Sequence, residues 1–134
     1  MDATRFEVVV SAGSLRPAPG EGVVMMPHRW TDEGVAVQAD FTGAHLYHLA
    51  AAGCVLNDLY REAAPLGIEL DGVRVRAYGA FDTAMWASTG FEYDVEVATG
   101  ADPDAVERLL RVVDEVAEIP KALRSGTTVA RRGV

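Results

Sequence analysis

The stretch GAHLYHLAAAGCVLNDLYREAAPLGIEL, residues 43–70, is mostly apolar and carries Cys54, the only cysteine of the chain. Apolar and small residues recur in it at helical spacing, and Thr42 directly before it is a suitable N-cap. The pattern therefore predicts a helix from Thr42 to Pro65. Because small and apolar residues cover several sides of this helix, we expect it at the centre of the fold or of an oligomer.

Three stretches of strand character precede this helix, with turn-forming residues between them. They are RFEVVVSA (residues 5–12), GVVMMPH (residues 22–28) and GVAVQADF (residues 34–41). Their succession predicts an amino-terminal antiparallel meander.

Two further strands are expected after the helix, because apolar residues alternate with polar ones in DGVRVRAYGAF (71–81) and FEYDVEVAT (91–99). The polar face of the first is basic and that of the second is acidic. If the two strands pair as an antiparallel hairpin, their opposite charges face each other and favour the register.

A second helix is indicated by Asp102 as N-cap and Pro103 at the first helical position, and it should end before Pro120. The closing stretch GTTVARRGV, residues 126–134, is expected to return to a sheet. The predicted order is βββ-α-ββ-α-β, an α+β fold in a single domain over residues 1–134.

The composition excludes several classes of protein. The net charge of -8 and the dispersed basic residues argue against nucleic-acid binding. The chain has no apolar run long enough to span a membrane and its amino terminus lacks a signal-peptide pattern, so we expect a cytoplasmic protein without membrane contact. A single cysteine forms no intramolecular disulfide, so any redox cycle must use a second thiol from outside.

These residues resemble the OsmC/Ohr family of osmotically inducible and organic hydroperoxide resistance proteins. The most specific part of the resemblance is the run of alanines and other small residues that directly precedes the helical cysteine. The stretches that carry the resemblance are residues 43–81, 91–100, 101–123 and 124–129, and the resemblance extends over nearly the whole chain. It implies an intertwined homodimer in which long central helices pack against antiparallel sheets, with the active site at the subunit interface. It also implies that Cys54 attacks an organic hydroperoxide and that a second cysteine resolves the sulfenic acid.

The chain departs from the family pattern at two positions. Ile119 stands before Pro120 where the resemblance implies the resolving cysteine. Ala44 stands where it implies a glutamate that positions an arginine. The resemblance assigns that arginine, which would stabilise the thiolate and the peroxide, to Arg16 or Arg29.

Other residues of the first helix have alternative interpretations. Tyr47 and Arg61 share roughly the face of Cys54, and Arg61 is either a local cation of the site or a solvated partner of Asp58 or Glu62. His45 either replaces the missing glutamate or, with His48, belongs to a metal-binding pair. Because no cluster completes such a pair, we expect neither a metal nor a cofactor.

The residues Trp30, Met85 and Trp86 either line an apolar pocket or cover a core. A pocket of that kind suits a small hydrophobic substrate such as an organic hydroperoxide.

Two functions remain. The first is a one-cysteine peroxidase, an oxidoreductase that reduces organic hydroperoxides and is restored by an external thiol reductant. The second is a dimeric small-molecule-binding or biosynthetic accessory protein that has lost peroxidase turnover.

Overall fold

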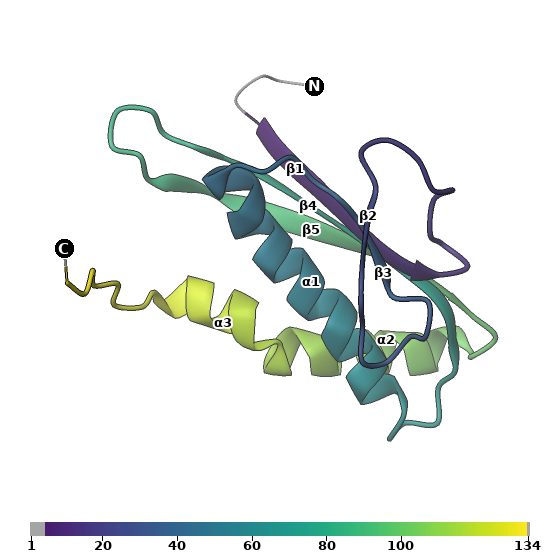
Figure 1. The fold of residues 1–134 in the computed structure, drawn as a ribbon. Coiled ribbons are helices and arrows are strands. Elements are labelled where there is room, and N and C mark those ends of the chain that lie inside the picture. The colour runs from purple at the N-terminus through teal and green to yellow at the C-terminus, as the bar shows by residue number, and fades with distance from the viewer. Residues whose placement is uncertain (1–4, 134) are drawn as a thin grey trace.

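The computed structural model describes residues 5–133, which form one antiparallel sheet with helices on one of its faces (Figure 1). The strands are β1 (Arg5–Gly13), β2 (Val24–Met26), β3 (Val35–Gln38), β4 (Leu70–Phe81) and β5 (Ser88–Thr99). The helices are α1 (Gly43–Ala63), α2 (Pro103–Val116) and α3 (Glu118–Ser125). The predicted α+β class is confirmed.

The strand order is β2-β3-β1-β4-β5. The predicted amino-terminal meander is confirmed for β2 and β3, which pair antiparallel, and is wrong for β1. β1 pairs with β3 and β4 instead of β2. The reason is burial: Val8, Val10 and Ala12 of β1 are fully buried and require a central position, whereas all of the short strand β2 is exposed and lies at an edge.

The predicted hairpin of β4 and β5 is confirmed, with the expected opposition of charges. Arg74 lies opposite Glu96 and Arg76 lies opposite Asp94, and each arginine forms an ion pair with its partner. These pairs lie on the solvent face of the sheet, where each contributes little to the free energy of unfolding but favours this register.

Helix α1 packs across the central strands β1 and β4 (Figure 1). Its N-cap is Thr42, as predicted, and the hydroxyl of Thr42 accepts a hydrogen bond from the amide of His45. The helix buries Val55, Leu56 and Leu59 against the sheet. This packing fixes the orientation of Cys54, which lies one residue before Val55.

Helix α2 begins as predicted, with Asp102 as N-cap and Pro103 in its first turn, and it ends before Pro120. The predicted closing strand is wrong. The extended Ala117 separates α2 from α3, and residues 126–133 are exposed and form neither helix nor strand. Because α3 directs the chain away from the sheet, these residues reach no strand edge (Figure 1). Val134 lies outside the described residues.

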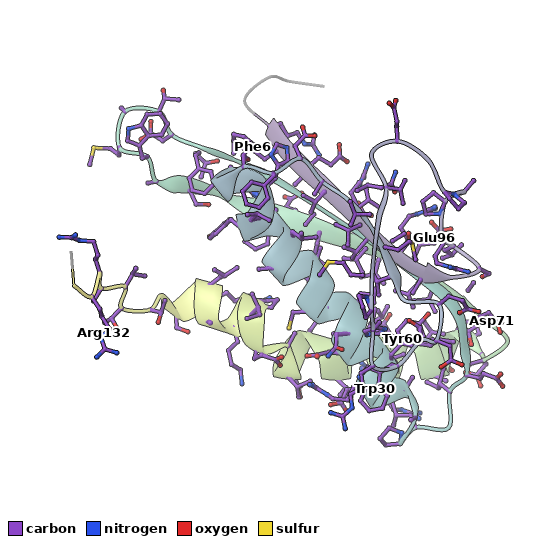
Figure 2. The ribbon with its side chains drawn as sticks, viewed as in Figure 1. Phe6, Trp30, Tyr60, Asp71, Glu96 and Arg132 are labelled. Carbon is purple, nitrogen blue, oxygen red and sulfur yellow. The ribbon has the colours of Figure 1, made fainter. Side chains whose placement is uncertain are left out.

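An aromatic cluster surrounds the first turns of α1, where Figure 2 labels Phe6. Phe6, Tyr47, Phe81 and Phe91 pack around the fully buried His48. The ring Nδ1 of His48 lies 2.7 Å from the carbonyl oxygen of Ala44 and donates to it, while Nε2 has no hydrogen-bond partner. The imidazole is therefore held in its neutral form.

We predict that the stability of the protein falls with acidification because of His48. Burial, assisted by the charge of His45, lowers the pKa of His48 despite the hydrogen bond to Ala44. The unfolded chain therefore takes up a proton first, so the stabilisation is present above about pH 6.5 and is lost as the pH falls below it. Urea midpoints measured between about pH 5 and 8 should show this loss. His48→Gln keeps a donor without titrating, and an equally steep loss in that variant would assign the effect to other groups.

Candidate functional site

Cys54 lies on the wall of an apolar pocket of about 490 Å³ beneath α1, and the cysteine is 9% exposed. The walls come from strands β1, β2 and β3, the β2–β3 loop, α1 and the start of α3. The residues that line it are Val10, Met26, Pro27, His28, Val35, Val37, Leu49, Ala50, Gly53, Cys54, Leu56, Asn57, Glu118 and Ile119. Gly53 leaves this space open, since a Cβ there would meet no atom within 4 Å.

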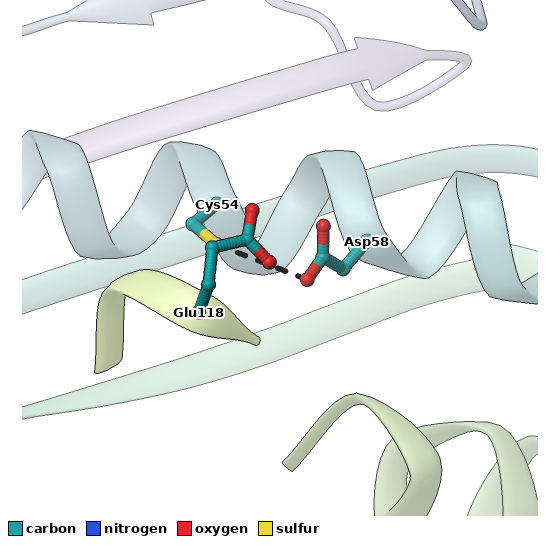
Figure 3. A group of neighbouring side chains, drawn as sticks. All are labelled: Cys54, Asp58 and Glu118. Carbon is teal, nitrogen blue, oxygen red and sulfur yellow. Dashed lines mark hydrogen bonds between the residues drawn. The ribbon is translucent and has the colours of Figure 1, made fainter. Parts of the chain in front are cut away.

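The thiol of Cys54 donates a hydrogen bond to Oδ2 of Asp58 over 3.8 Å (Figure 3). Asp58 follows Cys54 by one helical turn, so the two side chains share a face of α1. The carboxylate is fully buried, and its second oxygen, Oδ1, accepts a hydrogen bond from the Asn57 side chain at 3.2 Å. A buried carboxylate thus contacts the sulfur directly.

A cation and a second carboxylate complete this group. Nη2 of Arg61 lies 3.1 Å from Oδ2 of Asp58, and Nη1 lies 3.9 Å from Glu118. Glu118 reaches Cys54 and Asp58 from the first turn of α3 (Figure 3). The guanidinium therefore neutralises the carboxylates around the thiol, while its other contact, at 3.3 Å, is Glu62.

The surroundings keep Cys54 protonated. Burial raises the pKa of Cys54 to about 11, and the negative charges of Asp58 and Glu118 add to this rise. A hydrogen bond from the Ile119 backbone lowers the pKa of the thiol, but by less than burial raises it. At neutral pH the thiolate is a small minority, so nucleophilic chemistry at Cys54 needs a group that removes its proton.

The pKa values of the two carboxylates move in opposite directions. Burial raises the pKa of Asp58, although Asn57 and Arg61 oppose that rise. A hydrogen bond from its own backbone lowers the pKa of Glu118, whose side chain is 61% exposed. Glu118 therefore keeps its charge, and Asp58 is the carboxylate that more readily accepts a proton.

Cys54, Asp58 and Glu118 also bring three potential metal ligands together, with their donor atoms within 4.8 Å of one another. The guanidinium of Arg61 already lies against both carboxylates. Its positive charge disfavours a second cation in the same place. We therefore describe the group as a thiol, a carboxylate pair and an arginine.

The structure brings two of the sequence-predicted neighbours to Cys54. Ile119, at the position where a resolving thiol was expected, lines the same pocket. Arg61 contacts Asp58, as expected from its interpretation as a partner of Asp58 or Glu62. Because Asp58 also contacts the thiol, Arg61 is linked to Cys54 through this carboxylate.

The other predicted neighbours lie elsewhere in this chain. Nε of Arg16 bonds the Gly13 carbonyl, and Arg29 is exposed above the ring of Trp30. Neither arginine lines the pocket.

At the start of α1, Ala44 accepts the hydrogen bond of His48, His45 bonds the hydroxyl of Thr42, and Tyr47 belongs to the aromatic cluster. The histidines therefore serve the helix start and the aromatic cluster.

Trp30, Met85 and Trp86 form no part of the Cys54 pocket within this chain. They are 42%, 78% and 74% exposed, and none of them lines the pocket of Cys54. Met85 and Trp86 do not cover the core of this chain either, because they lie exposed in the loop between β4 and β5.

The sequence did not predict that Asp58 and Glu118 lie beside Cys54. Asp58 carries a usable signal, since it follows Cys54 by four residues on one helical face. Glu118 directly precedes the position recognised as that of the lost thiol. Nothing in the local pattern separates it from the solvated carboxylates of the late helix.

None of the helices in the described part of the chain is both long and apolar enough to cross a membrane.

Comparisons with known proteins bear on the family and the fold of this chain. A search of curated proteins gives no significant match. The structure is similar to that of an OsmC-like hydroperoxide resistance protein from Jannaschia sp. CCS1, with a TM-score of 0.61 and 15% identity over 94% of this chain and 91% of the other. The family model of OsmC-like protein matches residues 36–131. The chain therefore belongs to the OsmC-like protein family.

Proposed function

We propose that this protein is a peroxidase that reduces organic hydroperoxides at Cys54 and is regenerated by an external thiol. The observation that carries the proposal is the position of Cys54 on the wall of an apolar pocket of about 490 Å³. Such a volume accommodates an alkyl or aryl hydroperoxide next to the sulfur. Membership of the OsmC-like family and the likeness to a hydroperoxide resistance protein support the same reaction.

The second candidate is a small-molecule-binding or biosynthetic accessory protein without turnover. The specific observation in its favour is the thiol itself, because its raised pKa and the two carboxylates beside it oppose thiolate formation. Arg16 and Arg29 also lie outside the pocket of this chain. In this interpretation Cys54 is a small apolar wall residue and the pocket binds an unreactive apolar ligand.

Chemical trapping separates the two candidates. The protein is exposed to cumene hydroperoxide in the presence of a sulfenic-acid probe, and the adduct is located by mass spectrometry. The peroxidase predicts an adduct on Cys54 at low peroxide and consumption of the hydroperoxide when dithiothreitol is present. Absence of both under these conditions would favour the binding protein.

We also propose that the protein works as a homodimer in the cytoplasm. Apolar side chains lie exposed over α1, the edge strand β2 and the β4–β5 loop. They include Val24, Met25, Met26, Leu46, Met85 and Trp86, and Phe41 in the loop before α1 adds to them. Water contact with so much apolar surface is unfavourable, and a second copy that packs against it would cover it. Sedimentation equilibrium at micromolar concentration tests this, and a folded monomer would contradict it.

We predict that Ile119→Cys forms a disulfide with Cys54 after one equivalent of hydroperoxide. Ile119 and Cys54 line the same pocket, and the Ile119 backbone bonds the cysteine, so an introduced thiol lies close to the sulfenic acid. The disulfide should protect Cys54 from over-oxidation to sulfinic acid. Intact-mass analysis measures both products. Val116→Cys, at the end of α2 and outside the pocket, is the matched control; preferential disulfide formation in that variant would contradict the assigned geometry.

A further inference from the structure

We propose that Asp58 is the general base of this site, which takes the thiol proton of Cys54 as the sulfur attacks a hydroperoxide. The inference rests on the proposed peroxidase function and adds a catalytic residue to it. It assigns to a carboxylate on the same helix the activation that the sequence resemblance assigns to an arginine.

The contacts of Asp58 suit this role. Its Oδ2 accepts the hydrogen bond of the Cys54 thiol, so the proton needs to move only along an existing contact. Its other oxygen is held by the side-chain amide of Asn57. Asn57 in turn accepts a hydrogen bond from Nε2 of His28, in the β2–β3 loop, at 3.2 Å. The acceptor atom is thereby fixed against the sulfur.

The charges around Asp58 divide the work between two carboxylates. Arg61, Cys54 and Asn57 face Asp58 from α1, and Glu118 faces it from α3. Glu118 is exposed, paired with Arg61 and held in its charged form. Asp58 is buried, and burial favours its protonated form. When the pKa values of two neighbouring carboxylates are shifted in opposite directions, one of them can accept a proton while the other stays charged. Here Asp58 is the first and Glu118 is the second.

In the proposed reaction the hydroperoxide oxidises Cys54, and external thiols later reduce it again. The sulfur of Cys54 attacks the terminal oxygen of ROOH, an S–O bond forms and the O–O bond breaks, while the thiol proton passes to Asp58. Asp58 returns this proton to the leaving alkoxide, so the products are the alcohol ROH and the sulfenic acid. A first external thiol converts the sulfenic acid to a mixed disulfide and water. A second external thiol then attacks the mixed disulfide, which releases the disulfide of the two external thiols and restores the thiol of Cys54.

The variant Asp58→Asn tests whether Asp58 is a general base or acts only through its charge, because the two roles predict opposite changes in the rate of reaction with hydroperoxide. Removing the negative charge lowers the pKa of Cys54, so alkylation by iodoacetamide at about pH 8 should become faster. If Asp58 is the base, reaction with cumene hydroperoxide should instead become slower by about 10²-fold or more. If Asp58 acts only through its charge, both reactions become faster together, and that result would overturn the inference.

The pH profile gives a second readout. In the unaltered protein the rate of sulfenic acid formation should rise as Asp58 ionises and then level off at neutral pH. In the Asp58→Asn variant the rate should follow the thiolate fraction and keep rising into the alkaline range. Identical profiles would contradict the role of Asp58.

Two further variants guard the test. Glu62→Gln removes a carboxylate that contacts Arg61 but not Cys54, and the ratio of the two rates should stay unchanged in it. Should Asp58→Asn fail to fold, Asp58→Ala makes the same comparison, with Arg61 still paired to Glu62 and Glu118. An unaltered protein that alkylates at Cys54 but never reacts with hydroperoxide refutes the proposed function, and this role of Asp58 with it. Turnover with parallel acceleration in the variant refutes the inference alone.

Discussion

Cys54→Ser is expected to lower hydroperoxide reduction to the uncatalysed rate while the protein stays folded. A serine hydroxyl cannot be oxidised by a hydroperoxide, and Cys54 is the only cysteine of the chain, so no other thiol can replace it. Serine is similar in size, and its hydroxyl can donate to Asp58 as the thiol does. Dithiothreitol-dependent consumption of cumene hydroperoxide measures the loss, and circular dichroism measures the fold.

The same variant distinguishes a reaction from simple binding. If the pocket only binds an apolar ligand, Cys54→Ser should bind cumyl alcohol with nearly unchanged affinity, and the unaltered protein should show no turnover to lose. Hydroperoxide reduction that survives in Cys54→Ser would place the chemistry at another residue and end the proposal for this site.

Gly79→Ala is expected to destabilise the fold strongly. A Cβ at Gly79 would lie 2.6 Å from the carbonyl oxygen of Gly90, 2.6 Å from Cβ of Phe91 and 2.7 Å from Nε2 of His48. The first is backbone of the neighbouring strand and the last is a ring confined by the aromatic cluster, so neither can move away easily. We expect a loss of about 2–3 kcal/mol, or roughly 10 °C in Tm.

Gly53→Ala is the matched control for this substitution. A Cβ at Gly53 would meet no atom within 4 Å, and alanine favours a helix interior over glycine by up to ~1 kcal/mol. The control should therefore be as stable as the unaltered protein or more stable. Equal losses in the two variants would show that the packing around Gly79 is not the cause.

The carboxylate beside the thiol carries a cost in stability. Because the pKa of Asp58 is raised in the folded protein, its ionised form is disfavoured there, and the contribution present below about pH 3.8 is lost as the pH rises through the folded pKa. A buried aspartate that opposes folding at neutral pH needs a reason to be there. We attribute it to the proposed role of Asp58 as the base for Cys54.

Local sequence patterns were enough to predict the α+β class, helix α1 with its Thr42 cap, the start of α2 and the charge-matched pairing of β4 with β5. All of these depend on local periodicity, capping residues or neighbouring strands joined by one loop, which a single stretch of chain contains. The resemblance carried by the same residues singled out Cys54 and the position of Ile119.

Long-range packing set the place of β1 at the centre of the sheet and the path of the chain after α2. It also decided which charged groups surround the thiol. The pairing of β1 with both β3 and β4 depends on contacts between segments distant in the sequence, as does the approach of Glu118 to Asp58. No local pattern contains them. In the sequence, the half-buried Arg16, the exposed Arg29 and the buried Asp58 are all simply charged residues, and only their packing distinguishes them.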